Sequence, residues 1–191
     1  METVPNALIS LLLIFSGVII AATKSILGPT CAPPPQNDNS ETGREAREVQ
    51  RVFLAFVTAM LSSNLVDTLE SQANVQMASI EDFLKIIHTA ATDVTTIAPN
   101  RKTAILGLEM LAEKVPQLVP WDVLLRSVLV AIQAVKPDDA QSLAVLQECS
   151  SAIVLCHRLC PRGVQGTAEF ILNSSEVLEL GSPSLNFCRI R

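Results

Sequence analysis

The chain has no tyrosine and only one tryptophan, and aromatic residues make up 4% of its 191 residues. Apolar residues nevertheless amount to 49%, which is enough to bury a full core. A core without large rings must be filled by Leu, Ile, Val, Ala and Met. Because β-sandwiches are enriched in aromatic and β-branched residues, this composition favours closely packed helices.

Basic runs and the common catalytic motifs are also missing. The formal net charge is -5, and no block of five Lys or Arg occurs, which argues against nucleic-acid binding. There is no Gly-x-Ser-x-Gly elbow, phosphate-binding glycine loop or His-Glu-x-x-His motif. A Ser-His-acid triad would have to use His88 or His157, the two histidines of the chain. We therefore expect a protein that is not an enzyme and needs no cofactor or metal.

One long apolar run is present, at residues 7–22. It is short for a membrane span, which needs about 20 residues, but it fits the core of a secretion signal. Ala21 and Ala22 are small residues that suit a cleavage point, although Glu2 stands where a basic residue is usual. We predict that residues 1–22 are a cleaved signal peptide, with an uncleaved anchor as the alternative. The mature protein is then secreted, extracellular and without stable membrane association.

Residues 23–47 contain Gly28-Pro29 and three consecutive prolines at 33–35, followed by polar residues. They are predicted to form a linker. From 48 to 160, apolar residues recur at steps of three and four, the period of a helix with one buried face. Proline and capping residues divide this stretch into five helices, predicted over 48–65, 79–97, 100–115, 121–135 and 137–160.

Short connections make successive helices antiparallel. The predicted fold is therefore all-α, a five-helix antiparallel bundle behind an N-terminal signal segment, with a C-terminal tail at 161–191. That tail can hold a short helix or a strand. The residues predicted to face inward, helix by helix, are Val52, Phe53, Phe56, Val57 and Met60; Ile80, Phe83, Leu84, Ile87, Ala91, Val94 and Ile97; Ala104, Ile105, Leu108, Leu111, Ala112 and Val115; Leu124, Val128, Ala131, Ile132 and Val135; and Leu143, Leu146, Ser150, Ile153 and Val154.

Five cysteines are candidates for disulfide bonds in an oxidising secretory environment: Cys31, Cys149, Cys156, Cys160 and Cys188. Three of them share one face of the fifth helix and lie too far apart along it to bridge one another. They would pair with Cys31, Cys188 or a second subunit. The bridges either pin both tails to the fifth helix or make a covalent dimer. The Cys156-His157-x-x-Cys160 cluster lacks the fourth ligand of a zinc site.

Charged side chains decorate the second and third helices: Glu81, Asp82, Lys85, Glu109, Glu113 and Lys114. They form either a solvated face or a salt-sensitive dimer surface. His88 is interpreted as a boundary residue, or as a sensor of mild acid if it faces a partner. Asn173-Ser174-Ser175 is a candidate glycosylation site.

Two segments resemble a known family, the N-terminal domain of spider silk proteins (spidroins). The second helix of that family shows Met-x-x-Ile-x-Asp-x-Leu, and this chain has Met77-Ala78-Ser79-Ile80-Glu81-Asp82-Phe83-Leu84. The third shows Leu-x-x-Leu-x-Met, and this chain has Ile105-Leu106-Gly107-Leu108-Glu109-Met110, preceded by Lys102 as an approximate counterpart of a family basic residue. The resemblance covers residues 48–155.

The resemblance implies a domain that keeps silk proteins soluble and pairs into an antiparallel homodimer as pH falls. Carboxylates on the pairing face would repel until they are protonated. The expected function is thus that of a secreted, self-associating, non-enzymatic helical domain with silk proteins as partners. The alternative is a secreted helical ligand or lipid carrier, whose aromatic-poor interior opens around an acyl chain. A third reading is a hydrolase with an unrecognised site.

Overall fold

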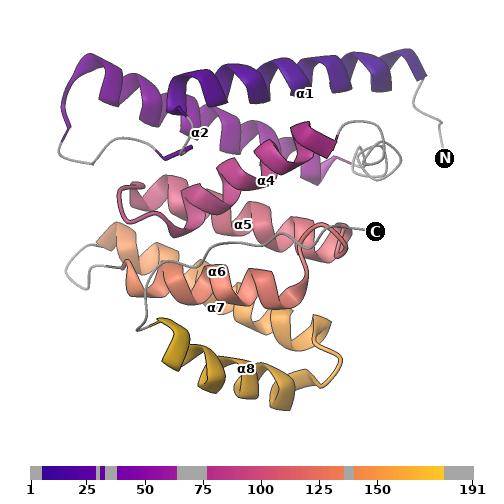
Figure 1. Ribbon diagram of the computed structural model, residues 1–191, viewed down its shortest axis with the longest axis vertical. Coiled ribbons are helices and arrows are strands. Elements are labelled where there is room, and N and C mark those ends of the chain that lie inside the picture. Colours follow the sequence, from indigo (N-terminus) through magenta and orange to yellow (C-terminus); the bar gives the residue numbers. More distant parts are fainter. Residues whose placement is uncertain (1–5, 29–30, 33–37, 64–76, 136–139, 179–191) are drawn as a thin grey trace.

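The computed structural model describes residues 6–28, 31–32, 38–63, 77–135 and 140–178. In this part of the chain there are seven α-helices and no strand, which confirms the all-α fold and corrects the predicted number of five. Figure 1 shows the helices in tiers, from α1 and α2 at one end of the molecule to α8 at the other. Their bounds are α1 Asn6–Leu27, α2 Glu41–Ser62, α4 Met77–Thr92, α5 Ala98–Lys114, α6 Trp121–Gln133, α7 Ala140–Leu159 and α8 Gly163–Leu178.

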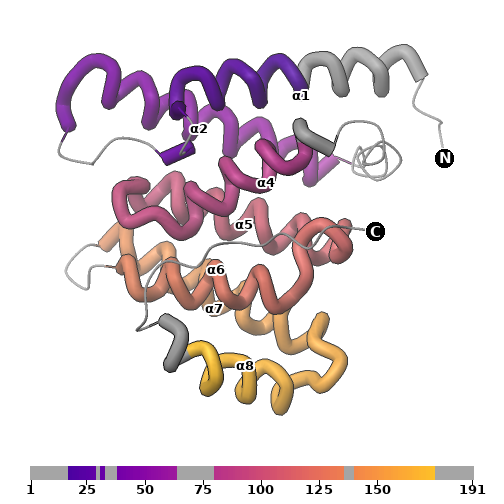
Figure 2. The backbone as a smooth tube through the Cα atoms, viewed as in Figure 1, coloured from indigo at the N-terminus to yellow at the C-terminus, as the bar shows by residue number. Residues whose placement is uncertain are grey.

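The five predicted helices correspond to α2, α4, α5, α6 and α7, and the two additional ones flank them. At the N-terminal side, α1 continues past Ala22 to Leu27 and contacts α2 and α4 (Figure 2). Whether residues 1–22 are removed as a signal stays a prediction. In the described part of the chain, no helix combines the length and hydropathy needed to cross a membrane. At the C-terminal side, residues 163–178 form helix α8, so the predicted tail contains a helix in this range and not a strand.

The predicted linker is wrong at both of its ends, because residues 23–27 and 41–47 are helical. The second error arises at Ser40, whose Oγ accepts a hydrogen bond from the Gly43 N–H at 3.0 Å and caps α2. The negative charge of Glu41 in the first turn interacts favourably with the positive, N-terminal end of the helix dipole. The following Arg, Glu and Ala residues are good helix formers, so a segment with little apolar surface still starts a helix.

The boundary between α4 and α5 also differs from the prediction. Helix α4 ends at Thr92, five residues before the predicted end at Ile97. Oδ1 of Asp93 accepts hydrogen bonds from the backbone N–H of Thr95 at 2.7 Å and from its hydroxyl at 2.6 Å, which stabilises a turn in place of another helical turn. Val94, predicted to face inward, is therefore exposed.

Asn100, the first residue of the predicted third helix, lies inside α5 instead of capping it. Pro99 fits in the first turn of α5, because backbone N–H groups in the first turn have no hydrogen-bond partner within the helix and the N–H that proline lacks is therefore not needed. Asn100 is buried, and its Nδ2 donates to Oε1 of Gln50 at 3.0 Å and to the Arg47 carbonyl at 3.1 Å. The amide thus joins α5 to α2 rather than ending a helix.

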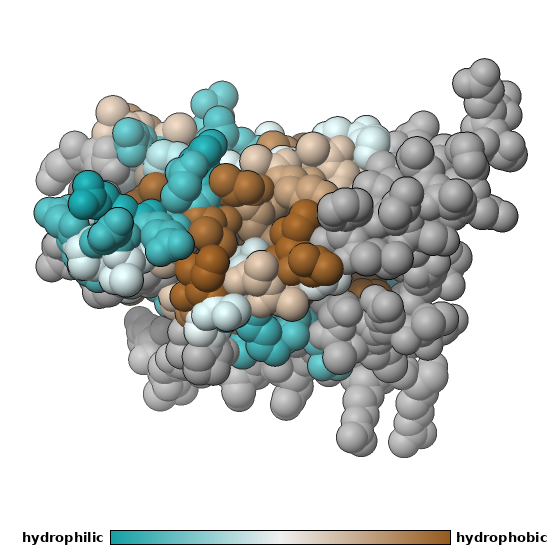
Figure 3. Space-filling view, turned by 90° about the horizontal axis from the view of Figure 1, so that it is seen from above, coloured by the Kyte–Doolittle hydropathy of each residue, from teal (hydrophilic) through white to brown (hydrophobic). Residues whose placement is uncertain are grey.

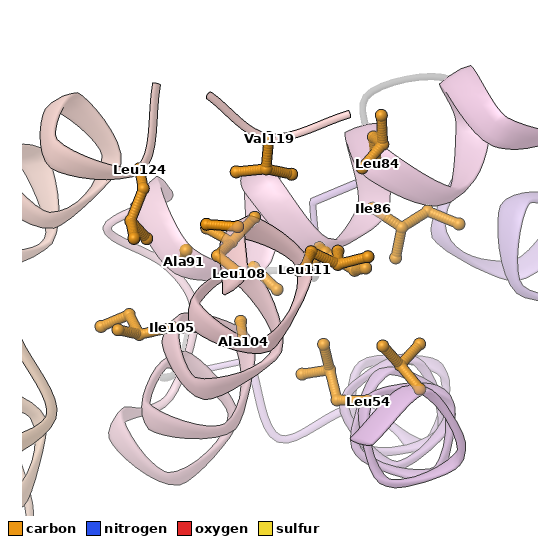
Figure 4. Close-up of a cluster of buried hydrophobic side chains, with 14 of the residues drawn as sticks. Leu54, Leu84, Ile86, Ala91, Ala104, Ile105, Leu108, Leu111, Val119 and Leu124 are labelled. Atoms are coloured by element: carbon orange, nitrogen blue, oxygen red, sulfur yellow. The ribbon is translucent and has the colours of Figure 1, made fainter. Parts of the chain in front are cut away.

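Helix α5 lies at the centre of the fold and contacts α2, α4, α6 and α7. Its predicted inward stripe is confirmed in full, since every member is buried. Figure 4 shows Leu108 and Leu111 of this stripe beside Val119, with Leu54 of α2 and Leu124 of α6 approaching from other directions. The buried stripe is Ala104, Ile105, Leu108, Leu111, Ala112 and Val115.

The inward face of α7 was predicted one residue out of phase. Leu143 and Val154 are each more than half exposed, as is Val52 of α2. Helix α7 turns its small and sulfur-containing residues inward instead. The prediction placed the largest apolar residues of this helix inside, whereas helices that approach each other closely leave room only for small side chains. The buried residues of α7 are Ser142, Val145, Cys149, Ala152, Leu155 and Cys156.

Contacts at the helix ends fix the directions of the helices. A hydrogen bond from the Cys156 thiol to the Trp121 carbonyl, 3.5 Å long, joins the end of α7 to the start of α6, so these two are antiparallel. Helices α2 and α5, in contrast, run parallel. Asn100 bonds to Gln50 at one end, and the Lys114 ammonium donates to the Leu61 carbonyl at the other. This is the relation expected of the first and third predicted helices when successive helices are antiparallel.

Candidate functional site

Carboxylates from two packed helices gather along the junction of α5 and α7. We call Glu109 and Glu113 of α5 with Glu148 of α7 the α5–α7 acidic cluster. The Glu148 side chain is only 16% exposed, and one of its oxygens lies 3.8 Å from the Lys102 ammonium. Glu109 is half-buried, and its Oε1 is buried without a hydrogen-bond partner among the described residues. The cluster thus holds more negative charge than Lys102 balances.

Burial raises the pKa of Glu109 to about 7, and the neighbouring negative charges of Glu148 and then Glu113 add to the effect. An ordinary glutamate stays ionised throughout the range from neutral to mildly acidic pH. Glu109 instead changes its charge close to neutrality. The chemistry available at this site is therefore the uptake of a proton that reduces repulsion on one face of the molecule.

The charged residues predicted for a dimer surface fall into two separate groups, one on α4 and one on α5. On α4, both oxygens of Asp82 accept hydrogen bonds from the Lys24 ammonium of α1 at 2.7 Å, while Glu81 and Lys85 are exposed. Lys102, Glu109 and Glu113 lie on α5, beside α7. Glu148 was missed by the sequence argument, because no local pattern brings it next to residues about 40 positions earlier.

The four described cysteines form no disulfide with one another, so the expected bridge between Cys31 and the fifth helix is absent, while pairing with Cys188 or with a second subunit stays a prediction. Cys31, Cys149, Cys156 and Cys160 are all buried, and Cys188 lies outside the described residues. Burial is the main cause that raises the pKa of Cys149 to about 11 and that of Cys156 to about 12. Because the thiolate is the reactive form, these side chains act as small apolar residues of the core.

Alkylation distinguishes free from bridged cysteines. Treating the native protein with iodoacetamide at pH 8 is expected to modify Cys149 and Cys156 more than about a hundredfold more slowly than after unfolding in denaturant without reductant. Peptide mass mapping gives the extent at each position. Cysteines that stay unmodified in the unfolded, unreduced chain would be bridged, contrary to this structure.

Other candidate residues have clear positions. Burial lowers the pKa of His88 to about 4, so it stays neutral in mild acid and does not suit the sensor that one alternative required. Asn173 is exposed on α8, and its glycosylation stays a prediction. In the described part of the chain, no three His, Cys, Asp or Glu side chains are grouped so that they could hold a metal ion.

Comparison with known proteins finds no relative from which a function could be carried over: no protein-family model, no curated protein and no solved structure matches this chain.

Proposed function

We propose that this protein is a secreted, non-enzymatic helical module that self-associates as pH falls below neutrality, and that silk proteins are its partners. The resemblance to spidroin N-terminal domains suggests the behaviour, and the α5–α7 acidic cluster is the observation that supports it. The proposal concerns the helices from α2 onward and does not depend on what happens to residues 1–22.

The outer stripe of α5 has the composition that pH-controlled pairing needs. Lys102, Leu106, Glu109 and Glu113 follow one another at steps of four, three and four, and so share one side of the helix. Leu106 is an exposed apolar residue in the middle of this stripe. In a twofold dimer each stripe meets its own copy, so a lysine near one end can meet a glutamate near the other. Glu109 lies between them.

Above pH 7, two ionised Glu109 side chains brought together by the dimer axis would repel each other. Below pH 7 they become neutral, and the repulsion falls without any change in the fold. Contacts between the lysine and glutamate side chains of the two stripes are electrostatic, so pairing should also weaken with added salt. This combination of proton uptake and salt sensitivity is the signature to look for.

Glu109→Gln imitates the protonated state and tests the proposal. The wild-type protein is expected to be mainly monomeric at pH 7.5 and dimeric at pH 5.5 in sedimentation velocity. The variant should lose most of this pH dependence and dimerise about tenfold more tightly at pH 7.5, which corresponds to about 1.4 kcal/mol. Glu45→Gln, an exposed glutamate on α2, is the matched control and should behave as wild type. Monomers at every pH would contradict the proposal.

A further inference from the structure

Helix α1 has one face joined to the bundle. Ile20, Thr23 and Leu27 recur at steps of three and four and are all buried, and α1 contacts both α2 and α4. Between them, the Lys24 ammonium donates to both oxygens of Asp82 on α4. The segment on either side of Ala22 is thus part of one packed unit, and cutting the chain there would divide it.

The opposite face of the same helix is exposed and mostly apolar, with Ser25 as its polar member. Val18 is 60% exposed and Ile26 is 44% exposed, and Ala21 and Ala22 between them are exposed as well. Figure 3 looks down on this end of the molecule and shows apolar residues gathered there, with hydrophilic residues to one side. The sequence has no charged residue between Glu2 and Lys24. Apolar surface of this kind marks a contact with a partner or a membrane.

The area of this face helps to identify what covers it. The residues of α1 whose side chains are described, 17–27, span about 16 Å. A face about 10 Å wide then offers roughly 160 Å², far less than the roughly 800 Å² that each partner contributes to a typical stable protein interface. A lipid bilayer needs no complementary shape and accepts the apolar face of a helix that lies parallel to its surface.

We propose that α1 stays attached to the bundle and lies in the plane of a phospholipid bilayer, with Val18, Ala22 and Ile26 among the acyl chains. In this arrangement the bundle fills the role of the polar face of an amphipathic helix, because it covers the inner side of α1. The attachment is hydrophobic, so it should be insensitive to salt, unlike the pairing through α5. It is independent of the proposed self-association, which uses other helices.

Flotation of the full chain with phosphatidylcholine vesicles tests this inference. Wild-type protein is expected to rise with the vesicles at low and high salt. Val18→Asp should reduce the bound fraction at least tenfold while leaving the helix content unchanged, because Val18 is outside the core. The matched control is Leu172→Asp, an apolar position on α8 that is somewhat more exposed than Val18, which should float as wild type does. Glu109→Gln should float too, so a failure of the self-association proposal would not be mistaken for a failure of this one.

A second measurement reports on depth. A tryptophan introduced by Val18→Trp in a Trp121→Phe background should be quenched by lipids brominated in their acyl chains, whereas one introduced by Leu172→Trp should not. The inference is overturned if wild-type protein stays below the vesicles, if Val18→Asp floats equally well, or if Val18→Trp is not quenched. It is also overturned if the intact mass shows cleavage at Ala22, or if Val18→Asp dissolves a dimer that forms without lipid.

Discussion

Replacing Arg101 with alanine is expected to lower the free energy of unfolding by about 3–5 kcal/mol. The Arg101 side chain is only 3% exposed. Its guanidinium donates to the carbonyls of Asp93 and Thr96 in the α4–α5 turn, at 2.8 and 3.1 Å. A longer contact of 3.4 Å reaches the Ala134 carbonyl at the end of α6. The substitution would leave these acceptors without a donor and open a cavity at the same time.

Burial lowers the pKa of Arg101, and the nearby Asp93 carboxylate opposes that effect. The guanidinium remains charged, so each of its hydrogen bonds is charge-assisted and stronger than a neutral one. Urea unfolding followed by circular dichroism measures the loss. Arg158→Ala, at an exposed arginine on α7, is the matched control and should cost less than about 0.5 kcal/mol. Equal effects at the two positions would show that Arg101 does not hold the turn.

The second large effect concerns pH. The contribution of His88 to the stability of the folded protein is expected to fall by about 2–3 kcal/mol between pH 7 and pH 4, because its side chain must take up a proton in a buried site. Burial lowers the pKa of His88 in the folded state from 6.5 to about 4. The contribution is therefore fully present above pH 6.5 and is lost as pH falls through about 4. His88→Leu should remove this acid-induced loss.

Glu109 acts in the opposite direction. Its pKa is raised in the folded state from 4.5 to about 7, so its contribution is fully present below pH 4.5 and is lost as pH rises through 7. The side chain is partly exposed, so solvent screening limits the effect to about 1–2 kcal/mol. The larger His88 contribution and the smaller Glu109 contribution oppose each other between pH 4.5 and 6.5, so together the two groups predict maximal stability near pH 6.5–7. Thermal unfolding from pH 4 to 8 checks this, with Glu109→Gln and Glu45→Gln as test and control. A profile that His88→Leu leaves unchanged would contradict the assignment to His88.

The buried faces of the helices differ in how far the sequence predicts them. The stripe of α5 was predicted in full because six apolar residues at helical spacing leave one way to bury them. On α7 the apolar period predicted Leu143 and Val154 as buried and missed Cys149 and Ala152. Hydrophobic periodicity depends only on the residue types along one helix, whereas burial also depends on the space left between neighbouring helices. The start of α2 was missed because its first turns are stabilised by capping and propensity rather than by apolar residues.

The sequence predicted only some of the residues of the candidate site and none of their interactions. Glu109 could be named as a charged residue on a helix, but its pKa depends on burial and on Glu148, which comes from α7. In the same way, Asp82 could be named, but not its pairing with Lys24 of α1. The cysteines could be counted, whereas their burial as free thiols could not be foreseen.

By itself, the sequence determined the helical class and most of the residues that fill the centre, because both follow from a local period of apolar side chains. The tertiary structure alone decided that α2 and α5 pack side by side, that α1 packs on the bundle with one face left exposed, and which charges meet. Those outcomes depend on contacts between segments far apart in the chain, and burial and electrostatic energy are properties of such contacts.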